Sequence, residues 1–142
     1  MGKINYYKII LPLAIFGIGL ALYLLYETFG PVHTSLCYVN STINCDASTK
    51  GSLAQLFGIP VPLYGLTGFV FILLGVAKKW PKLILGMAAF GTFFCLRIIV
   101  LEIFWIKAYC PVCLACQIVM LSLMYFGLKL VLNERSVSKN RQ

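Results

Sequence analysis

The feature that most constrains the fold of this chain is a pair of cysteines at the start of a long apolar segment. The motif Cys-Pro-Val-Cys, residues 110–113, opens a stretch that carries no charged residue from Ala108 to Leu128. About 20 consecutive apolar residues can cross a bilayer as an α-helix. Cys110 lies where a helix N-cap is expected, and Pro111 suits the first helical position because it has no N–H group to leave unsatisfied. Cys113 then falls in the first turn, where the helix dipole favours a thiolate. The motif predicts a reactive dithiol at a membrane surface.

The composition agrees with a membrane location. The 142 residues are 61% hydrophobic and 11% charged, with a mean hydropathy of +0.91. So few polar side chains could not cover a soluble domain of this size. The net charge of +8 could indicate nucleic-acid binding in a soluble protein. Here the basic residues lie between apolar runs, so we interpret them as determinants of membrane topology and expect no nucleic-acid partner.

The uncharged runs predict an all-α integral membrane protein with a four-helix transmembrane bundle in a single domain, residues 1–142. The expected spans cover about 9–28, 61–77, 83–106 and 111–132. The polar segment between the first two spans, residues 29–60, is expected to be an exterior loop with a short interfacial helix from Leu53 to Phe57. A cleaved signal peptide is the alternative for the first run, but its length and the lack of a clear cleavage site favour a retained helix.

Four spans place both termini on the same side of the membrane, and the positive-inside rule makes that side cytoplasmic. The loop cysteines Cys37 and Cys45, together with Cys110 and Cys113, then face the exterior, where disulfides persist. Lys50 and Lys107 lie on that exterior side. The basic residues expected on the cytoplasmic side are Lys3, Lys8, Lys78, Lys79, Lys82, Lys129, Arg135, Lys139 and Arg141.

Two cysteine pairs on one membrane face suggest a thiol–disulfide relay, because exchange requires a thiolate of one pair to reach a sulfur of the other. A plain structural disulfide between Cys37 and Cys45 is the alternative for the loop. Cys110, Cys113 and Cys116 could also suggest metal binding, but a fourth nearby ligand is missing, so we expect no metal. Cys95 and Cys116 are expected to be packing residues inside apolar helices.

Three polar residues within the expected spans have open roles. A charge inside a span is costly, so Arg97 and Glu102 suggest a function, although Glu102 lies close enough to the exterior surface to snorkel. The five-residue spacing of this pair places them on different helix faces. Gln117 follows Cys113 by one helical turn, and its amide could bond a ligand carbonyl or a neighbouring helix.

Three motifs together resemble the vitamin K epoxide reductase family, including its bacterial disulfide-forming members. The first is Cys37 and Cys45-Asp46 in the exterior loop, the second is Phe57-Gly-Ile-Pro-Val-Pro-Leu-Tyr-Gly65, and the third is Tyr109-Cys-Pro-Val-Cys113. Their order and spacing agree over nearly the whole chain. The resemblance implies a four-helix bundle around a quinone of the ubiquinone, menaquinone or vitamin K type.

The resemblance also implies roles for individual residues. Cys37 would meet the thiol of an external partner, Cys45 would attack Cys110, and Cys113 would be the thiolate that faces the quinone. Gln117 takes the place of a quinone-contacting Tyr of animal members. Val61 stands near the position of an expected Asn. These two residues and Tyr64 are the candidate quinone contacts. Ser52, beside Gly51, is the candidate for a Ser or Thr that the family has in its loop.

The implied function is that of a membrane oxidoreductase that oxidises an extracytoplasmic thioredoxin-like protein and reduces a membrane quinone, which supports disulfide bond formation. Because the sequence shows no fused thioredoxin-like domain, we expect that partner to be a separate protein, with membrane lipid around the bundle. A vitamin K quinone or epoxide reductase is the alternative within the family. A metal-binding membrane carrier and a structural four-span protein are alternatives from other classes.

Overall fold

The computed structural model describes residues 5–30, 39–43, 55–107 and 109–141. Its long elements are all helical, and a short hairpin of two strands precedes the second of the helices described. In chain order the elements are α1 (Tyr6–Phe29), β1 (Gln55–Leu56), β2 (Ile59–Pro60), α3 (Val61–Ala77), α4 (Pro81–Leu101), the π-helical turn η1 (Glu102–Ile106) and α5 (Pro111–Lys139).

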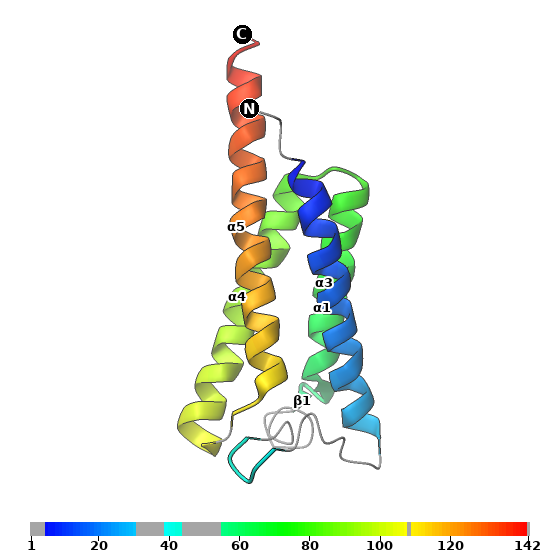
Figure 1. Cartoon of the computed structure of the whole chain (residues 1–142), viewed down its shortest axis with the longest axis vertical. Coiled ribbons are helices and arrows are strands. Elements are labelled where there is room, and N and C mark those ends of the chain that lie inside the picture. Colours follow the sequence, from blue (N-terminus) through cyan, green and yellow to red (C-terminus); the bar gives the residue numbers. More distant parts are fainter. Residues whose placement is uncertain (1–4, 31–38, 44–54, 108, 142) are drawn as a thin grey trace.

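The helices stand side by side in one bundle (Figure 1). Packing runs in a ring, with α1 against α3, α3 against α4, α4 against α5, and α5 back against α1. The chain passes up and down through this ring, so neighbouring helices are antiparallel. One end of the bundle holds the start of α1 and the end of α5. The opposite end holds the β1–β2 hairpin, η1 and the start of α5 (Figure 1).

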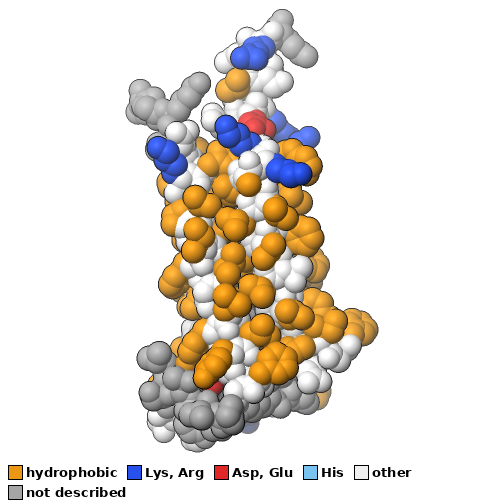
Figure 2. All heavy atoms as spheres, turned by 90° about the vertical axis from the view of Figure 1, so that its right-hand side faces the viewer, with side chains coloured by type: hydrophobic (Ala, Val, Ile, Leu, Met, Phe, Trp, Pro, Cys, Tyr) orange, Lys and Arg blue, Asp and Glu red, His pale blue; other side chains and the backbone are white. Residues whose placement is uncertain are grey.

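The outer surface of the bundle is apolar along most of its length (Figure 2). Large side chains such as Phe16, Phe90, Phe93 and Ile118 are more than half exposed. Among the described residues, three helices are long and apolar enough to span a membrane: α1, α4 continued by η1, and α5. The apolar helix α3 is shorter, with 17 residues. A continuous apolar exterior is what lipid contact requires, so the chain is an integral membrane protein.

Basic side chains gather at the end of the bundle where α1 begins (Figure 2). Lys78 and Lys79 lie between α3 and α4, and Lys129 begins a basic segment in the last turns of α5. The ammonium of Lys78 lies 5.3 Å from the ring centre of Trp80, and that of Lys129 lies 5.7 Å from the ring of Tyr125. Such cation–π pairs suit a membrane–water interface, where the ring has an apolar side and a wet edge.

The helix starts follow the prolines of the sequence. Pro62, Pro81 and Pro111 each occupy the first or second position of a helix, where the missing N–H group costs no hydrogen bond. The residues of the expected 61–77 segment are those of α3, and α1 and α5 extend a few residues beyond their expected bounds. The α4 helix begins two residues early and ends at Leu101, and η1 continues it to Ile106, the expected end. The largest extension is in α5, which continues past residue 132 to Lys139 as an exposed polar helix.

The expected interfacial helix is wrong for Gln55, Leu56 and Phe57; Leu53 lies outside the described residues. Gln55 pairs with Pro60 and Leu56 with Ile59 in an antiparallel hairpin. Phe57 and Gly58 form its two-residue turn with φ values of 56° and 80°. Two consecutive positive φ values match the right-handed twist of paired strands, and they end any helix. The Tyr64 hydroxyl donates to the Leu56 carbonyl at 3.1 Å and fixes the hairpin to α3.

The core of the bundle contains a close approach between α1 and α3. Phe69, which is 1% exposed, packs its ring into the space where a side chain at Gly17 would project. A glycine at this position therefore lets the two helices approach around a large aromatic ring. Gly19, two residues further along α1, has open space where a Cβ would lie.

We expect Gly17→Ala to destabilise the bundle by about 1–3 kcal/mol, because the added methyl group overpacks the Phe69 ring. Gly19→Ala is the matched control and should raise stability slightly, since alanine favours a helix by about 1 kcal/mol over glycine. Thermal unfolding of both variants in detergent, followed by circular dichroism, checks this. Equal melting temperatures for the two variants would contradict the packing seen here.

Candidate functional site

The dithiol motif lies in a sharp reversal between η1 and α5. Lys107 adopts a left-handed conformation with φ 54° and ψ 33°, which ends the π-helical turn. Cys110 is extended and caps α5, and its Sγ accepts a hydrogen bond from the Cys113 N–H at 3.4 Å. Pro111 begins the helix. The N-cap position of Cys110 and the first-turn position of Cys113 are therefore confirmed, and both sulfurs lie at the positive end of the α5 dipole.

Cys110 is buried, with 1% of its surface exposed. It packs against Leu24 of α1, in a cluster that also includes Tyr23 and Val112. Its neighbour Tyr109 donates its backbone N–H to the Thr42 carbonyl at 2.8 Å, and Ile43 forms a parallel bridge with Tyr109. The part of the loop around Thr42 therefore lies directly beside Tyr109, the residue that precedes Cys110.

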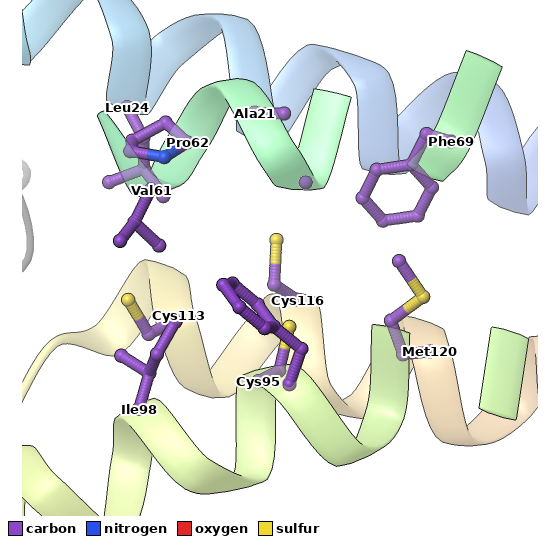
Figure 3. A pocket seen from close by; sticks show the side chains of 12 residues that line it. Ala21, Leu24, Val61, Pro62, Phe69, Cys95, Ile98, Cys113, Cys116 and Met120 are labelled. Carbon is purple, nitrogen blue, oxygen red and sulfur yellow. The ribbon is translucent and has the colours of Figure 1, made fainter. Parts of the chain in front are cut away.

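Cys113 lines an apolar cavity inside the bundle (Figure 3). Val61, Pro62, Leu24 and Ile98 surround the end of the cavity that holds Cys113, and Phe69 and Met120 lie at the far end (Figure 3). Every helix of the ring contributes to the wall. The remaining described residues that line it are Ala21, Gly65, Phe94, Cys95 and Cys116.

A groove between α3 and α4 adjoins this cavity. Gly65, Phe94, Cys95 and Met120 line both spaces. The groove continues along side chains of α3 and α4 such as Leu63, Tyr64, Phe71, Met87 and Phe90. Phe71 and Phe90 are partly exposed on the apolar exterior, at 44% and 63%. The groove is therefore lined in part by side chains of the apolar exterior, where a molecule dissolved in lipid could reach it.

Glu102 lies beside the dithiol. Its side chain is 2% exposed, and Cys113 Sγ donates a hydrogen bond to Glu102 Oε1 at 3.8 Å. The interpretation of Glu102 as a snorkelling residue is therefore wrong. Arg97 is exposed and borders a shallow hollow under the hairpin with Gln55 and Leu56, so the prediction that Arg97 and Glu102 face different directions is confirmed. The signal missed in the sequence is the short distance along the chain from Glu102 to Cys110, which places both at the same end of the bundle.

The candidate quinone contacts occupy three different places. Val61 lines the cavity with Cys113, whereas Tyr64 lines the adjoining groove. Gln117 is not among the described residues that line either space. Its buried Oε1 has no hydrogen-bond partner within the described part of the chain. Buried amide oxygens are nearly always bonded, so Gln117 retains an acceptor that a ligand or a moved side chain could satisfy.

Three predicted site residues, Cys37, Cys45 and Ser52, lie outside the described residues. Cys95 and Cys116 are thiols in the helical core, as expected for packing residues, and both border the cavity. In the ranges that the structure describes, His, Cys, Asp and Glu side chains form no group of three suited to holding a metal ion.

The fold and the site define a membrane helix bundle that carries one thiol, Cys110, at a helix N-cap and a second, Cys113, on an apolar internal cavity. The family model described as vitamin K epoxide reductase family matches residues 8–128, and the chain belongs to that family. Comparison with curated proteins gives no match.

Family membership gives the general activity. The protein is an oxidoreductase of the membrane, and its family links thiol oxidation to a quinone or to a quinone epoxide. Both cysteines of the motif and the whole cavity lining fall inside the matched residues. The resemblance noted in the sequence is therefore confirmed at the level of the family.

Proposed function

We propose that this protein transfers electrons from an extracytoplasmic thioredoxin-like dithiol protein to a membrane quinone, and so supports disulfide bond formation in exported proteins. The observation that carries the proposal is the position of the two motif sulfurs. Cys110 packs beside the residue that holds the exterior loop, and Cys113 lines the apolar cavity. A dithiol placed between a protein-facing loop and an apolar cavity can exchange with a disulfide on one side and with a quinone on the other.

On the protein side, the proposed path begins at the loop. Thr42 and Ile43, which contact Tyr109, belong to the segment between Cys37 and Cys45 in the sequence. We propose that Cys37 reacts with the partner and that Cys45 forms a transient mixed disulfide with Cys110. Ser52 is proposed to support the loop near this exchange.

On the quinone side, the cavity and the groove fit the chemistry of the substrate. Their walls are made of aliphatic, aromatic and sulfur-containing side chains. A quinone has a flat apolar ring, and its isoprenoid tail partitions into lipid, so an apolar space that adjoins the bundle exterior suits both parts. We propose Val61 and Tyr64 as contacts. Gln117 is the proposed polar contact, because its amide oxygen is buried with its bonding capacity unused by the described residues.

We further propose that the chain forms one domain with four transmembrane spans. With 17 residues, α3 is about 25 Å long at 1.5 Å per residue, slightly shorter than the roughly 30 Å hydrocarbon core. It packs between α1 and α4, and the hairpin precedes it at its exterior end. The basic end of the bundle is proposed to be cytoplasmic, which directs Cys110 and Cys113 to the exterior.

Turnover with two kinds of donor tests the proposed function. Wild-type protein in detergent should oxidise both a small dithiol and a thioredoxin-like dithiol protein while reducing a ubiquinone or menaquinone analogue, followed by ultraviolet absorbance. Cys45→Ala should lose turnover with the protein donor by at least about a hundredfold, because the mixed disulfide with Cys110 cannot form. Turnover with the small dithiol should persist, since that donor can reduce the Cys110–Cys113 disulfide directly.

The two donors separate the possible failures. Loss of both activities in Cys45→Ala would refute the proposed order of the relay. Failure of the folded wild-type protein to reduce either quinone would refute the oxidoreductase proposal for this chain.

A further inference from the structure

Glu102 is an acidic side chain in a costly environment. Removing a carboxylate from water without compensation costs several kcal/mol or more, so buried acids in membrane proteins usually serve a function. Glu102 is 2% exposed at the end of an apolar helix, and its Oε1 lies 3.8 Å from Cys113 Sγ. The Cys113 thiol, which lines the cavity, therefore donates its hydrogen bond to the Glu102 carboxyl group.

The local backbone holds this pair in place. The Glu102 N–H still bonds back to the Ile98 and Ile99 carbonyls of α4, and η1 then widens into a π-helical turn before the reversal at Lys107. The start of α5 consequently packs against the end of α4, which brings residues 102 and 113 together. Single π-helical turns within a helix often mark functional sites, because they displace one side chain from the regular helical path.

The cavity lies on the other side of Cys113. Glu102 is not among the described residues that line it, whereas Cys113 is. The Cys113 residue thus both lines the apolar space and bonds the carboxyl group through its sulfur. A base within hydrogen-bond reach of the nucleophile, but outside the lining of the binding space, can activate a thiol without occupying that space.

We propose that Glu102 is the general base that accepts the Cys113 proton when the dithiol is oxidised. This inference rests on the proposed function. Oxidation breaks the S–H bonds of Cys110 and Cys113, forms one S–S bond and releases two electrons and two protons. Both electrons and both protons are taken up by a quinone, which becomes a quinol. Glu102 takes up the Cys113 proton when it leaves the sulfur and passes it on before the quinol is complete, which returns Glu102 to its ionised form.

The titratable groups that the structure places near Glu102 come from α5, from its own helix and from α1. From α5, the sulfurs of Cys110 and Cys113 face its carboxyl group. On its own helix Arg97 is exposed, and Lys107 is exposed beyond η1. From α1, Glu27 is buried at the same end of the bundle, at 5% exposure. Glu27 is therefore a natural control for the loss of a second buried carboxyl group.

Glu102→Gln tests the inference, because glutamine keeps the size and an acceptor oxygen but cannot take up a proton. We expect kcat for quinone reduction near neutral pH to fall at least about tenfold, within the range that general bases contribute. The apparent KM for quinone should change less than about twofold, because Glu102 is not among the described residues that line the cavity and its substitution leaves the contacts with the quinone in place. Glu102→Asp should restore part of kcat, and Glu27→Gln should retain it.

A second readout needs no quinone. In the reduced full-length protein, iodoacetamide labels Cys113, and mass spectrometry of the labelled peptide gives its rate. We expect this rate to fall about tenfold at neutral pH in Glu102→Gln and to recover above about pH 8.5, where an unassisted thiol ionises. Glu27→Gln should keep the wild-type pH profile, and Cys116 in the same molecules provides an internal reference.

The outcomes are distinct. A wild-type labelling profile in Glu102→Gln, or the same slowing in Glu27→Gln, would overturn the role of Glu102. Slower labelling in Glu102→Gln alone, with no quinone reduction by the wild-type protein, would retain Glu102 as the base for Cys113 and refute the quinone proposal instead.

Discussion

Cys113→Ala is expected to lower the rate of quinone reduction by at least about a thousandfold. Cys113 lines the cavity, and the two electrons for the quinone come from formation of the Cys110–Cys113 disulfide, which needs both sulfurs. Without the Cys113 thiolate, no motif cysteine remains to attack Cys110 and release Cys45 from the Cys45–Cys110 mixed disulfide. The variant should therefore accumulate the Cys45–Cys110 adduct, whereas Cys110→Ala should accumulate none.

Alkylation of the remaining thiols followed by non-reducing gel electrophoresis and peptide mapping checks this pairing. Cys95→Ala is a suitable control, because that thiol lies deeper in the helical core and is not part of the proposed relay. Absence of the Cys45–Cys110 adduct in Cys113→Ala, or an adduct between Cys45 and Cys113 in Cys110→Ala, would contradict the assignment of Cys113 as the cysteine that faces the quinone.

Gly65→Leu is expected to block the cavity without unfolding the bundle. Gly65 lines both the cavity and the groove, and no atom lies within 4 Å of the position of an added Cβ. A leucine would project into open space, and it should favour α3 because leucine is a better helix former than glycine. We expect the apparent KM for quinone to rise about tenfold or more, equivalent to at least about 1.4 kcal/mol of binding free energy.

Gly86→Leu provides the matched control. Gly86 also has open space around the position of an added Cβ, but it lies on the exposed side of α4 and is not among the described residues of the cavity or the groove. Steady-state kinetics with a short-chain quinone should show little change in this variant. Equal effects of the two substitutions, or an unchanged KM in Gly65→Leu at retained thermal stability, would indicate that the quinone binds elsewhere.

The sequence was most informative where local chemistry decides the structure. Pro81 and Pro111 predict helix starts, because a proline in the first turn loses no hydrogen bond. The same rule, applied to Cys110 and Cys113, predicted which cysteine caps α5 and which enters its first turn. Long uncharged runs predicted the apolar helices, since only a helix satisfies its own backbone in lipid.

Short elements were less predictable. The segment from Gln55 to Phe57 has a composition that permits a helix, but the positive φ values at Phe57 and Gly58 and the hydrogen bond from Tyr64 produce a hairpin. Phe57 is an uncommon residue for a positive φ, so its side chain gave no indication of the turn. The hydrogen-bond partner of the hairpin, the Tyr64 hydroxyl, comes from α3 and could not be identified from the sequence of residues 55–57.

What the sequence alone determined is the membrane helices, the dithiol at the start of α5 and the family. The helices and the dithiol depend on residues close together in the chain, and the family on short motifs in a fixed order. Only the tertiary structure decided what surrounds Cys113. The cavity is built from all the helices of the ring, and the contact between Glu102 and Cys113 depends on how α4 ends and α5 begins. Such contacts follow from side-chain packing between helices, which periodicity and composition do not specify.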